Sequence, residues 1–155
     1  MNYQTALVQL PLVCEAGVQK VASPADAYRV CADIASLAQE SFHVLTVNAK
    51  NRLINRHLVT LGLVDGTSVH PREVFRTAIQ DGASGIIVAH NHPSGDATAS
   101  AEDLRITRQL IDAGKIVDIK VLDNVIVGRP VAPVGDQPGH PGYLSLRESG
   151  LVAFG

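Results

Sequence analysis

The sequence of 155 residues is poor in aromatic residues and in cysteine. It has no tryptophan, three phenylalanines and three tyrosines, so it lacks an aromatic platform for stacking nucleic-acid bases, and its core must be aliphatic. Two cysteines, Cys14 and Cys31, are too few for a disulfide framework and indicate reduced thiols in a bacterial-type cytoplasm. The absence of a Cys-x-x-Cys pair excludes the thiolate zinc site of nucleobase deaminases.

A charge excess of one sign is also missing. Thirteen basic residues against 15 acidic ones give a net charge of −2, which offers no field for non-specific binding to nucleic acid. No apolar run approaches the roughly 20 residues that span a bilayer, and residues 1–10 lack the basic start of a signal peptide. We therefore expect a cytoplasmic protein whose partners are neither nucleic acid nor membrane.

The chain length and its 46% of hydrophobic residues predict a single globular domain. We expect an N-terminal arm over residues 1–22 and the domain over 23–155. Apolar spacing and the positions of proline and glycine predict three helices and a series of strands. The helices are expected over 24–39, 71–79 and 101–113, the last stopped by Gly114, and the strands over 42–47, 52–61, 86–89 and within 116–127. Helices that alternate with strands predict an α/β or α+β fold around one mixed sheet.

Connections and the end of the chain are less regular. The turn at 48–51 should join two strands into a β-hairpin, and 62–69 is expected to be a loop. Residues 129–142 contain four prolines and three glycines, which predicts a mobile loop with little regular structure. A tolerated surface insertion is favoured there over a substrate-facing lid or a partner site. Residues 143–155 could add a short strand or helix.

The segment from His90 to Asp103 carries the chemistry. His90 and His92 lie two residues apart at the end of a predicted buried strand, so both imidazoles should point to one face. Asp103, in the first turn of the next helix, could bring a carboxylate to the same point. Two nitrogens and one oxygen with a fourth position open are typical of a catalytic zinc site.

A purely structural interpretation of the same residues stays open. Ser100-x-x-Asp103 is also an ordinary capping box at a helix start. His90 and His92 could be loop histidines beside a turn set by Pro93 and Gly95. The two interpretations of the Ser100–Asp103 pair are compatible, because one side chain can cap the helix while its neighbour binds metal.

The spacing His90-x-His92, seven residues, then Ser100-x-x-Asp103 resembles the JAMM motif of the MPN/JAB metalloprotease family. The surrounding segments are similar to its RadC-like JAB branch, and they run in order along most of the chain: 45–54 (LTVNAKNRLI), 70–75 (HPREVF), 90–96 (HNHPSGD) and 143–146 (YLSL). The resemblance implies a single JAB/MPN domain, a central mixed sheet flanked by helices and related to the cytidine-deaminase fold.

The resemblance also assigns roles. It implies one zinc ion held by His90, His92 and Asp103, with Glu40 as general acid/base and Ser100 as hydrogen-bond donor to an oxyanion. No other cofactor is implied, and the expected substrate is a protein or peptide. We expect Asn91 and Ser94 to shape the loop or support the ligands, and His43, His57, His70 and Arg72 to have structural roles.

The chain departs from the RadC pattern in two further places besides the long 129–142 segment. It lacks a helix-hairpin-helix-like region before the domain, and Asn124 stands where the family usually has histidine after an aspartate. A zinc-dependent hydrolase of peptide or isopeptide bonds is the leading hypothesis. A non-catalytic JAB interaction module and a DNA-repair-associated factor are the alternatives, and the sequence leaves the oligomeric state open, a homo-oligomer included.

Overall fold

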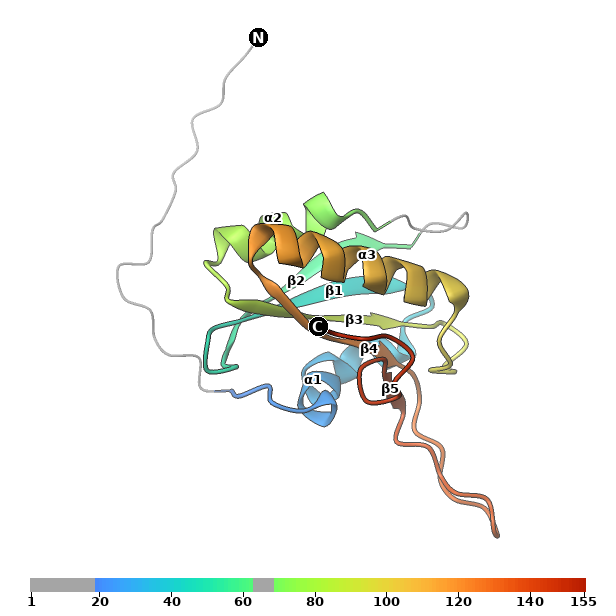
Figure 1. Ribbon diagram of the computed structural model, residues 1–155. Helices are drawn as coiled ribbons and strands as arrows, with labels where there is room; N and C mark the ends of the chain where they lie inside the picture. The colour runs from blue at the N-terminus through green and yellow to red at the C-terminus, as the bar shows by residue number, and fades with distance from the viewer. Residues whose placement is uncertain (1–18, 63–68) are drawn as a thin grey trace.

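Five strands form one mixed sheet in the order β2-β1-β3-β4-β5. The computed structural model describes residues 19–62 and 69–155 (Figure 1). Within these residues the elements are α1 (Pro24–Cys31), a 3-10 helix η1 (Ala32–Ser36), β1 (Ser41–Val47), β2 (Leu53–Leu61), α2 (Pro71–Gln80), β3 (Gly85–Asn91), α3 (Ala101–Val117), β4 (Lys120–Val127) and β5 (Tyr143–Ser145). Only the β3–β4 pair is parallel, and α3 makes the crossover between these two strands. The predicted α+β fold with one mixed sheet is confirmed.

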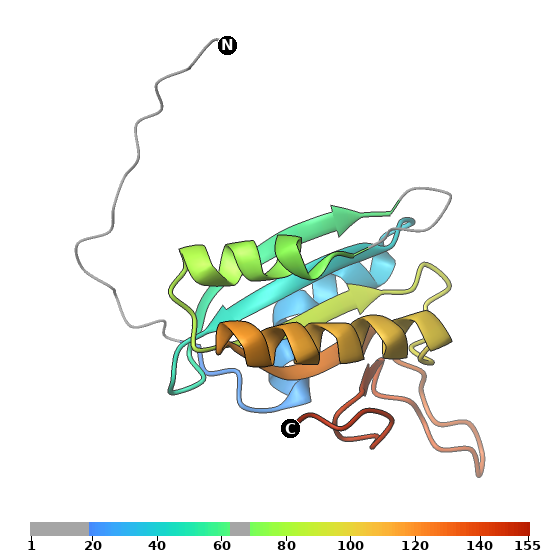
Figure 2. The ribbon, with the colours of Figure 1, turned by 45° about the horizontal axis from the view of Figure 1, so that its top comes forward.

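Helices cover both faces of the sheet. α2 and α3 lie on one face and α1 on the other (Figures 1 and 2). Alternate residues of the strands belong to two separate hydrophobic cores. Val44 and Val88 pack under α2 and α3, whereas Leu45 and Ala89 pack under α1. Every residue of β1 and of β3 is buried, as expected for central strands. The part of the chain that the structure describes has no helix with both the length and the apolar character of a membrane span.

The predicted hairpin is confirmed. β1 and β2 pair antiparallel, and the turn is stabilised by Asn48, whose Oδ1 accepts the backbone N–H groups of Lys50 and Arg52 at 2.9 and 3.1 Å. Asn51 takes the left-handed conformation at φ 56°, which asparagine tolerates better than most residues. The hairpin makes β2 the outer strand and places the beginning of β1 beside the end of β3.

Two predicted helix ends were wrong. The first helix leaves α geometry after Cys31 and continues as a 3-10 helix to Ser36 rather than to residue 39. Arg56 Nη1 donates to the Val30 carbonyl at 2.8 Å, an acceptor that a longer α-helix would use for itself. The third helix runs through Gly114 to Val117. Gly114 is needed inside it for close approach, because a Cβ there would lie 2.5 Å from the Ile119 carbonyl oxygen.

The segment 129–142 contains no helix or strand. It runs out from the sheet as two adjacent stretches (Figures 1 and 2), joined by bridges between Val131 and His140 and between Val134 and Gln137. Its turn contains Gly135 at φ 58°. The expectation of little regular structure is confirmed, because the segment contains no helix or strand and its two stretches are joined only by isolated bridges.

The predicted arm lies mostly outside the described residues, as do Cys14 and most of the 62–69 loop. At its end, Lys20 forms a bridge to Arg52, and Val21 is buried under α1. The prediction for 143–155 is confirmed by β5, which pairs antiparallel with the end of β4.

Candidate metal centre

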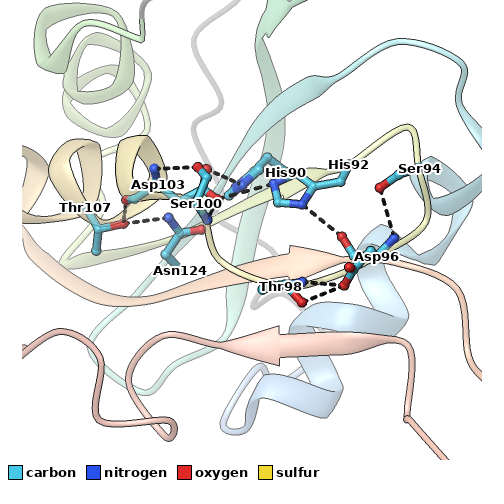
Figure 3. A network of polar contacts seen from close by, with 9 residues as sticks. All are labelled: His90, His92, Ser94, Asp96, Thr98, Ser100, Asp103, Thr107 and Asn124. Atoms are coloured by element: carbon cyan, nitrogen blue, oxygen red, sulfur yellow. Dashed lines mark hydrogen bonds and ion pairs between the residues drawn. The ribbon is translucent and has the colours of Figure 1, made fainter.

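The centre lies where β3 ends and α3 begins. His90 is the penultimate residue of β3, His92 follows one residue after the strand, and Asp103 is the third residue of α3. Figure 3 shows the three side chains turned toward one another beside the first turn of the helix. Glu40 joins them from the residue before β1, and each of the four residues offers a ligand atom within 4.8 Å of the others. The predicted set of metal-binding residues and Glu40 is thus brought together in space.

The carboxylate of Asp103 touches both imidazoles. Oδ1 lies 2.9 Å from His90 Nε2, and Oδ2 lies 3.3 Å from His92 Nε2. Contact with both rings outweighs the opposing effect of burial, so the pKa of the Asp103 carboxyl is well below its usual range. The same contact raises the pKa of His92, again against burial. Asp103 is therefore an ionised carboxylate, and its negative charge attracts a cation to the position beside the two histidines.

The two histidines are oriented by groups outside the centre. The His92 ring donates from Nδ1 to the Asp96 carbonyl oxygen, 2.9 Å away. A carbonyl only accepts, so Nδ1 carries a proton, and in the neutral ring Nε2 has a free lone pair facing Asp103. The His90 ring stacks on Phe42, with ring centroids 5.7 Å apart. Loop 92–96 and strand β1 thus hold the rings in place.

The donor set fits a divalent cation. His90 is 1% exposed, yet neither of its ring nitrogens has a hydrogen bond of acceptable geometry in the described residues. A buried polar atom without a partner is costly unless a ligand satisfies it. Two ligands of a tetrahedral zinc, each about 2.0–2.1 Å from the ion, lie roughly 3.3 Å apart, close to the two separations between imidazole and carboxylate. Two imidazoles with carboxylate oxygens suit zinc and similar transition metals.

An open cavity of about 620 Å³ gives access to this centre. Glu40 and Ser100 are exposed at its wall, whereas His90 and Asp103 are buried. Its other walls include Phe42, Thr60, Val69, His92, Ile106 and Asn124. The donor atoms are therefore bordered by a cavity that opens to solvent.

Ser100 caps α3 in the way its sequence predicts. Its Oγ accepts the backbone N–H of Asp103 at 3.1 Å, and its own N–H donates to Asp103 Oδ2 at 2.7 Å. The helix cap and the contact with His92 use the same carboxylate oxygen. The capping interpretation and the metal interpretation thus describe one carboxylate.

A chain of hydrogen bonds under Asp103 was not expected from the sequence. Thr107 Oγ1 donates to the Asp103 carbonyl at 2.6 Å and accepts from Asn124 Nδ2 at 2.7 Å. Asn124 is fully buried, and its Oδ1 has no partner among the described residues. The Asn124 amide thus braces the first turn of α3, at the position where the resemblance implies a histidine. The position of Thr107 one helical turn after Asp103 was the available signal.

His43, His57 and His70 are not part of the ligand cluster. His57 Nε2 is 2.6 Å from Asp81, and His43 is buried beside Ser41. His70 precedes α2 without capping it through its side chain. Ser94 Oγ accepts the Asp96 backbone N–H at 3.2 Å, which shapes the loop that holds His92.

Comparison with known proteins places the fold and the centre in one family. The sequence model of the RadC-like JAB domain matches residues 21–151. The chain belongs to the RadC-like JAB domain family. The match covers all of the described sheet and helices, so the JAB domain contains Glu40, both histidines and Asp103.

Relatives of this JAB domain carry the name UPF0758 protein. One from Symbiobacterium thermophilum is 47% identical over 119 residues, 77% of this chain and 46% of the relative. One from Listeria monocytogenes is 41% identical over 143 residues, 92% and 59% of the two chains. One from Thermotoga maritima is 41% identical over 132 residues, 85% and 54%. The chain spans about half the length of the curated relatives it matches.

Proposed function

We propose that this JAB domain is a zinc-dependent hydrolase of the JAMM class that cleaves peptide or isopeptide bonds. The observation that supports it is the convergence of Glu40, His90, His92 and Asp103 at the wall of an open cavity. These side chains come from three separate segments of the chain. The buried His90 ring, whose nitrogens have no hydrogen bond of acceptable geometry in the described residues, is costly in a purely structural site, which favours a bound cation.

Each residue of the centre has a separate task. His90, His92 and Asp103 would hold the ion, which when bound lowers the pKa of a water molecule and polarises a carbonyl. The Asp96 carbonyl keeps His92 Nε2 available as a ligand by fixing the proton on Nδ1. Asp103 keeps its negative charge because both imidazoles lower its pKa.

Glu40 is the proton carrier in this proposal. Its carboxylate is exposed at the cavity and close to the ligand atoms, where an attacking water and a scissile amide would meet. It takes one proton from the water as the new C–O bond forms. It then gives that proton to the leaving nitrogen as the C–N bond breaks, so that an acid and an amine are released.

Ser100 would stabilise the oxyanion that forms at the substrate carbonyl. Its Oγ already accepts from the Asp103 backbone N–H, which fixes its position at the first turn of α3. The hydroxyl proton remains available to donate toward the cavity. A serine can therefore cap the helix and serve the reaction at the same time.

Metal content and turnover test the proposal together. We expect about one zinc per wild-type chain and almost none in His92→Ala after purification without added zinc, measured by elemental analysis. Glu40→Gln should keep the zinc and lose hydrolysis of peptide and isopeptide substrates. Wild-type protein that takes up no metal when zinc is offered would contradict the proposal and leave the interaction module as the better hypothesis.

A further inference from the structure

Asn91 lies between the two histidines of the centre but faces the other side of the sheet. Residues 86 and 88, of the same parity as His90, belong to the core under α2 and α3. Residues 87 and 89, of the same parity as Asn91, belong to the core under α1. The Asn91 side chain is fully buried there, so its hydrogen bonds must be made within the protein.

The Asn91 amide joins the two peptide groups on either side of Glu40. Its Oδ1 accepts the Ser41 backbone N–H and the Ser41 hydroxyl, both at 2.8 Å. Its Nδ2 donates to the Gln39 carbonyl at 3.0 Å. The backbone pairing between β1 and β3 ends at Phe42 and His90. Beyond that pair, the Asn91 amide connects the two segments through its side chain.

Residues 39–41 are also held from the side of β2, by the residue that follows that strand. The Gly62 N–H donates to the Glu40 carbonyl at 2.6 Å. The backbone from residue 39 to 41 is thus fixed from β3 on one side and from the chain after β2 on the other. The Glu40 carboxylate projects from a fixed backbone, although the side chain itself is exposed.

A chain of hydrogen bonds sets the orientation of the Asn91 amide. Arg56 can only donate, so its Nε, 3.3 Å from His43 Nδ1, requires the His43 proton on Nε2. His43 Nε2 then donates to Ser41 Oγ at 3.1 Å, which leaves the hydroxyl proton for Asn91. Asp33 anchors Arg56 through two contacts of 2.8 and 3.0 Å. Burial, helped by the charge of Arg56, lowers the pKa of His43 to about 4, so the ring stays neutral near pH 7.

We infer that Asn91 is a positioning residue that holds Glu40 against the metal centre from the opposite face of the sheet. Among the described residues, its amide is the one side-chain group that bonds both peptides flanking Glu40, and the Arg56–His43–Ser41 chain fixes the orientation of that amide. The inference rests on the proposed function, in which Glu40 carries a proton and therefore has to lie close to the metal ligands. It predicts that loss of Asn91 moves the Glu40 carboxylate while the three ligands stay in place.

Cobalt is a suitable probe because paramagnetic relaxation falls with the inverse sixth power of distance. The wild-type chain of 155 residues and its Asn91→Ala variant are loaded with Co²⁺. The relaxation of the Glu40 side-chain carboxyl carbon is measured by ¹³C NMR and assigned with Glu40→Gln. We expect equal Co²⁺ content in the two proteins and a severalfold weaker effect on Glu40 in Asn91→Ala. Equal relaxation in both would overturn the inference and leave the proposed function untouched.

Two further variants separate positioning from general loss of stability. Thr46→Val removes a buried hydrogen bond to Asp81 elsewhere in the fold, so it should lower stability without altering the Glu40 signal. Asn91→Ser keeps a polar group too short to join both peptides, and it should weaken the signal even where Asn91→Ala does not fold. An altered Glu40 signal in Thr46→Val would contradict a specific role for Asn91. Failure of the wild-type protein to bind Co²⁺ would overturn both the proposed function and the inference.

Discussion

Two helices of this protein begin with the same local motif and have different surroundings. Ser23 and Asp26 cap α1, and Ser100 and Asp103 cap α3, each pair with the reciprocal hydrogen bonds of a capping box. Outside the capping box, Asp26 accepts the Ala22 N–H and contacts Arg29 of its own helix, at the surface. Asp103 contacts His90 and His92, which come from β3 and the loop after it.

The difference shows that a helix start alone does not make a metal site. Both serines and both aspartates satisfy the free N–H groups of the first turn, as their sequence predicts. The first turns of both helices border an open cavity, but only the cavity at α3 is lined by histidines, which come from the end of β3 and the residue after it. The chemistry therefore depends on what the sheet places in front of the cap.

Removal of each aspartate charge should give the largest contrast between the two caps. We expect Asp103→Asn to lose zinc, because a neutral amide oxygen is a poorer ligand, whereas Asp26→Asn keeps it. Zinc at about 1,000 times its Kd stabilises a folded protein by roughly 4 kcal/mol, so added zinc should raise the Tm of Asp26→Asn but not of Asp103→Asn. Differential scanning calorimetry with and without zinc measures this, and an equal rise in both would contradict the site.

Loss of the Thr107 hydroxyl should have the next largest effect. Thr107→Val leaves the buried Asn124 amide without its acceptor, at a cost of about 1–3 kcal/mol. Thr77 of α2 also donates to a carbonyl of its own helix but supports no other residue, so Thr77→Val is the matched control. Urea denaturation should show the larger loss of stability for Thr107→Val. Equal losses would argue against the brace under Asp103.

The two capping serines should contribute equally to stability but not to turnover. Ser23→Ala and Ser100→Ala each remove an N-cap acceptor, which costs about 1 kcal/mol. We expect Ser100→Ala alone to lower the rate of hydrolysis, with its zinc content unchanged. Equal turnover by the two variants would exclude Ser100 as oxyanion donor.

The smallest expected contrast is in the pH dependence of the metal-free protein. The pKa of His92 is raised by Asp103, so this pair stabilises the fold fully below the ordinary histidine pKa of about 6.5, and the contribution is lost as pH rises through the raised value. His92→Gln should therefore cost more stability at pH 5 than at pH 8, measured by urea denaturation with a chelator. The pKa of Asp26 is lowered mainly by its hydrogen bond with Ser23, so Asp26→Asn should lower the stability by the same amount at pH 5 and at pH 8. A cost for His92→Gln that does not change with pH would contradict the assignment.

Much of the site follows from local sequence. The alternation along a buried strand puts His90 and His92 on one side, and Ser100 with Asp103 defines the start of α3, because both rules act within a few residues. Glu40 could be named only from the family resemblance, since its neighbours Gln39 and Ser41 give no sign of a ligand. Its arrival at the centre depends on the antiparallel pairing of β1 with β3, whose paired residues are 38 to 48 positions apart in the chain.

What the sequence alone determined is therefore local: the helix starts, the hairpin turn at 48–51, the buried strands and the paired histidines, each fixed by backbone preference or side-chain periodicity. The tertiary structure decided the features that depend on distant partners. Arg56 uses the Val30 carbonyl where the first helix changes to 3-10 geometry, the Ile119 carbonyl requires glycine within α3, and Asn91 reaches the peptides around Glu40. Such features arise when polar groups far apart in sequence are buried together and must satisfy one another.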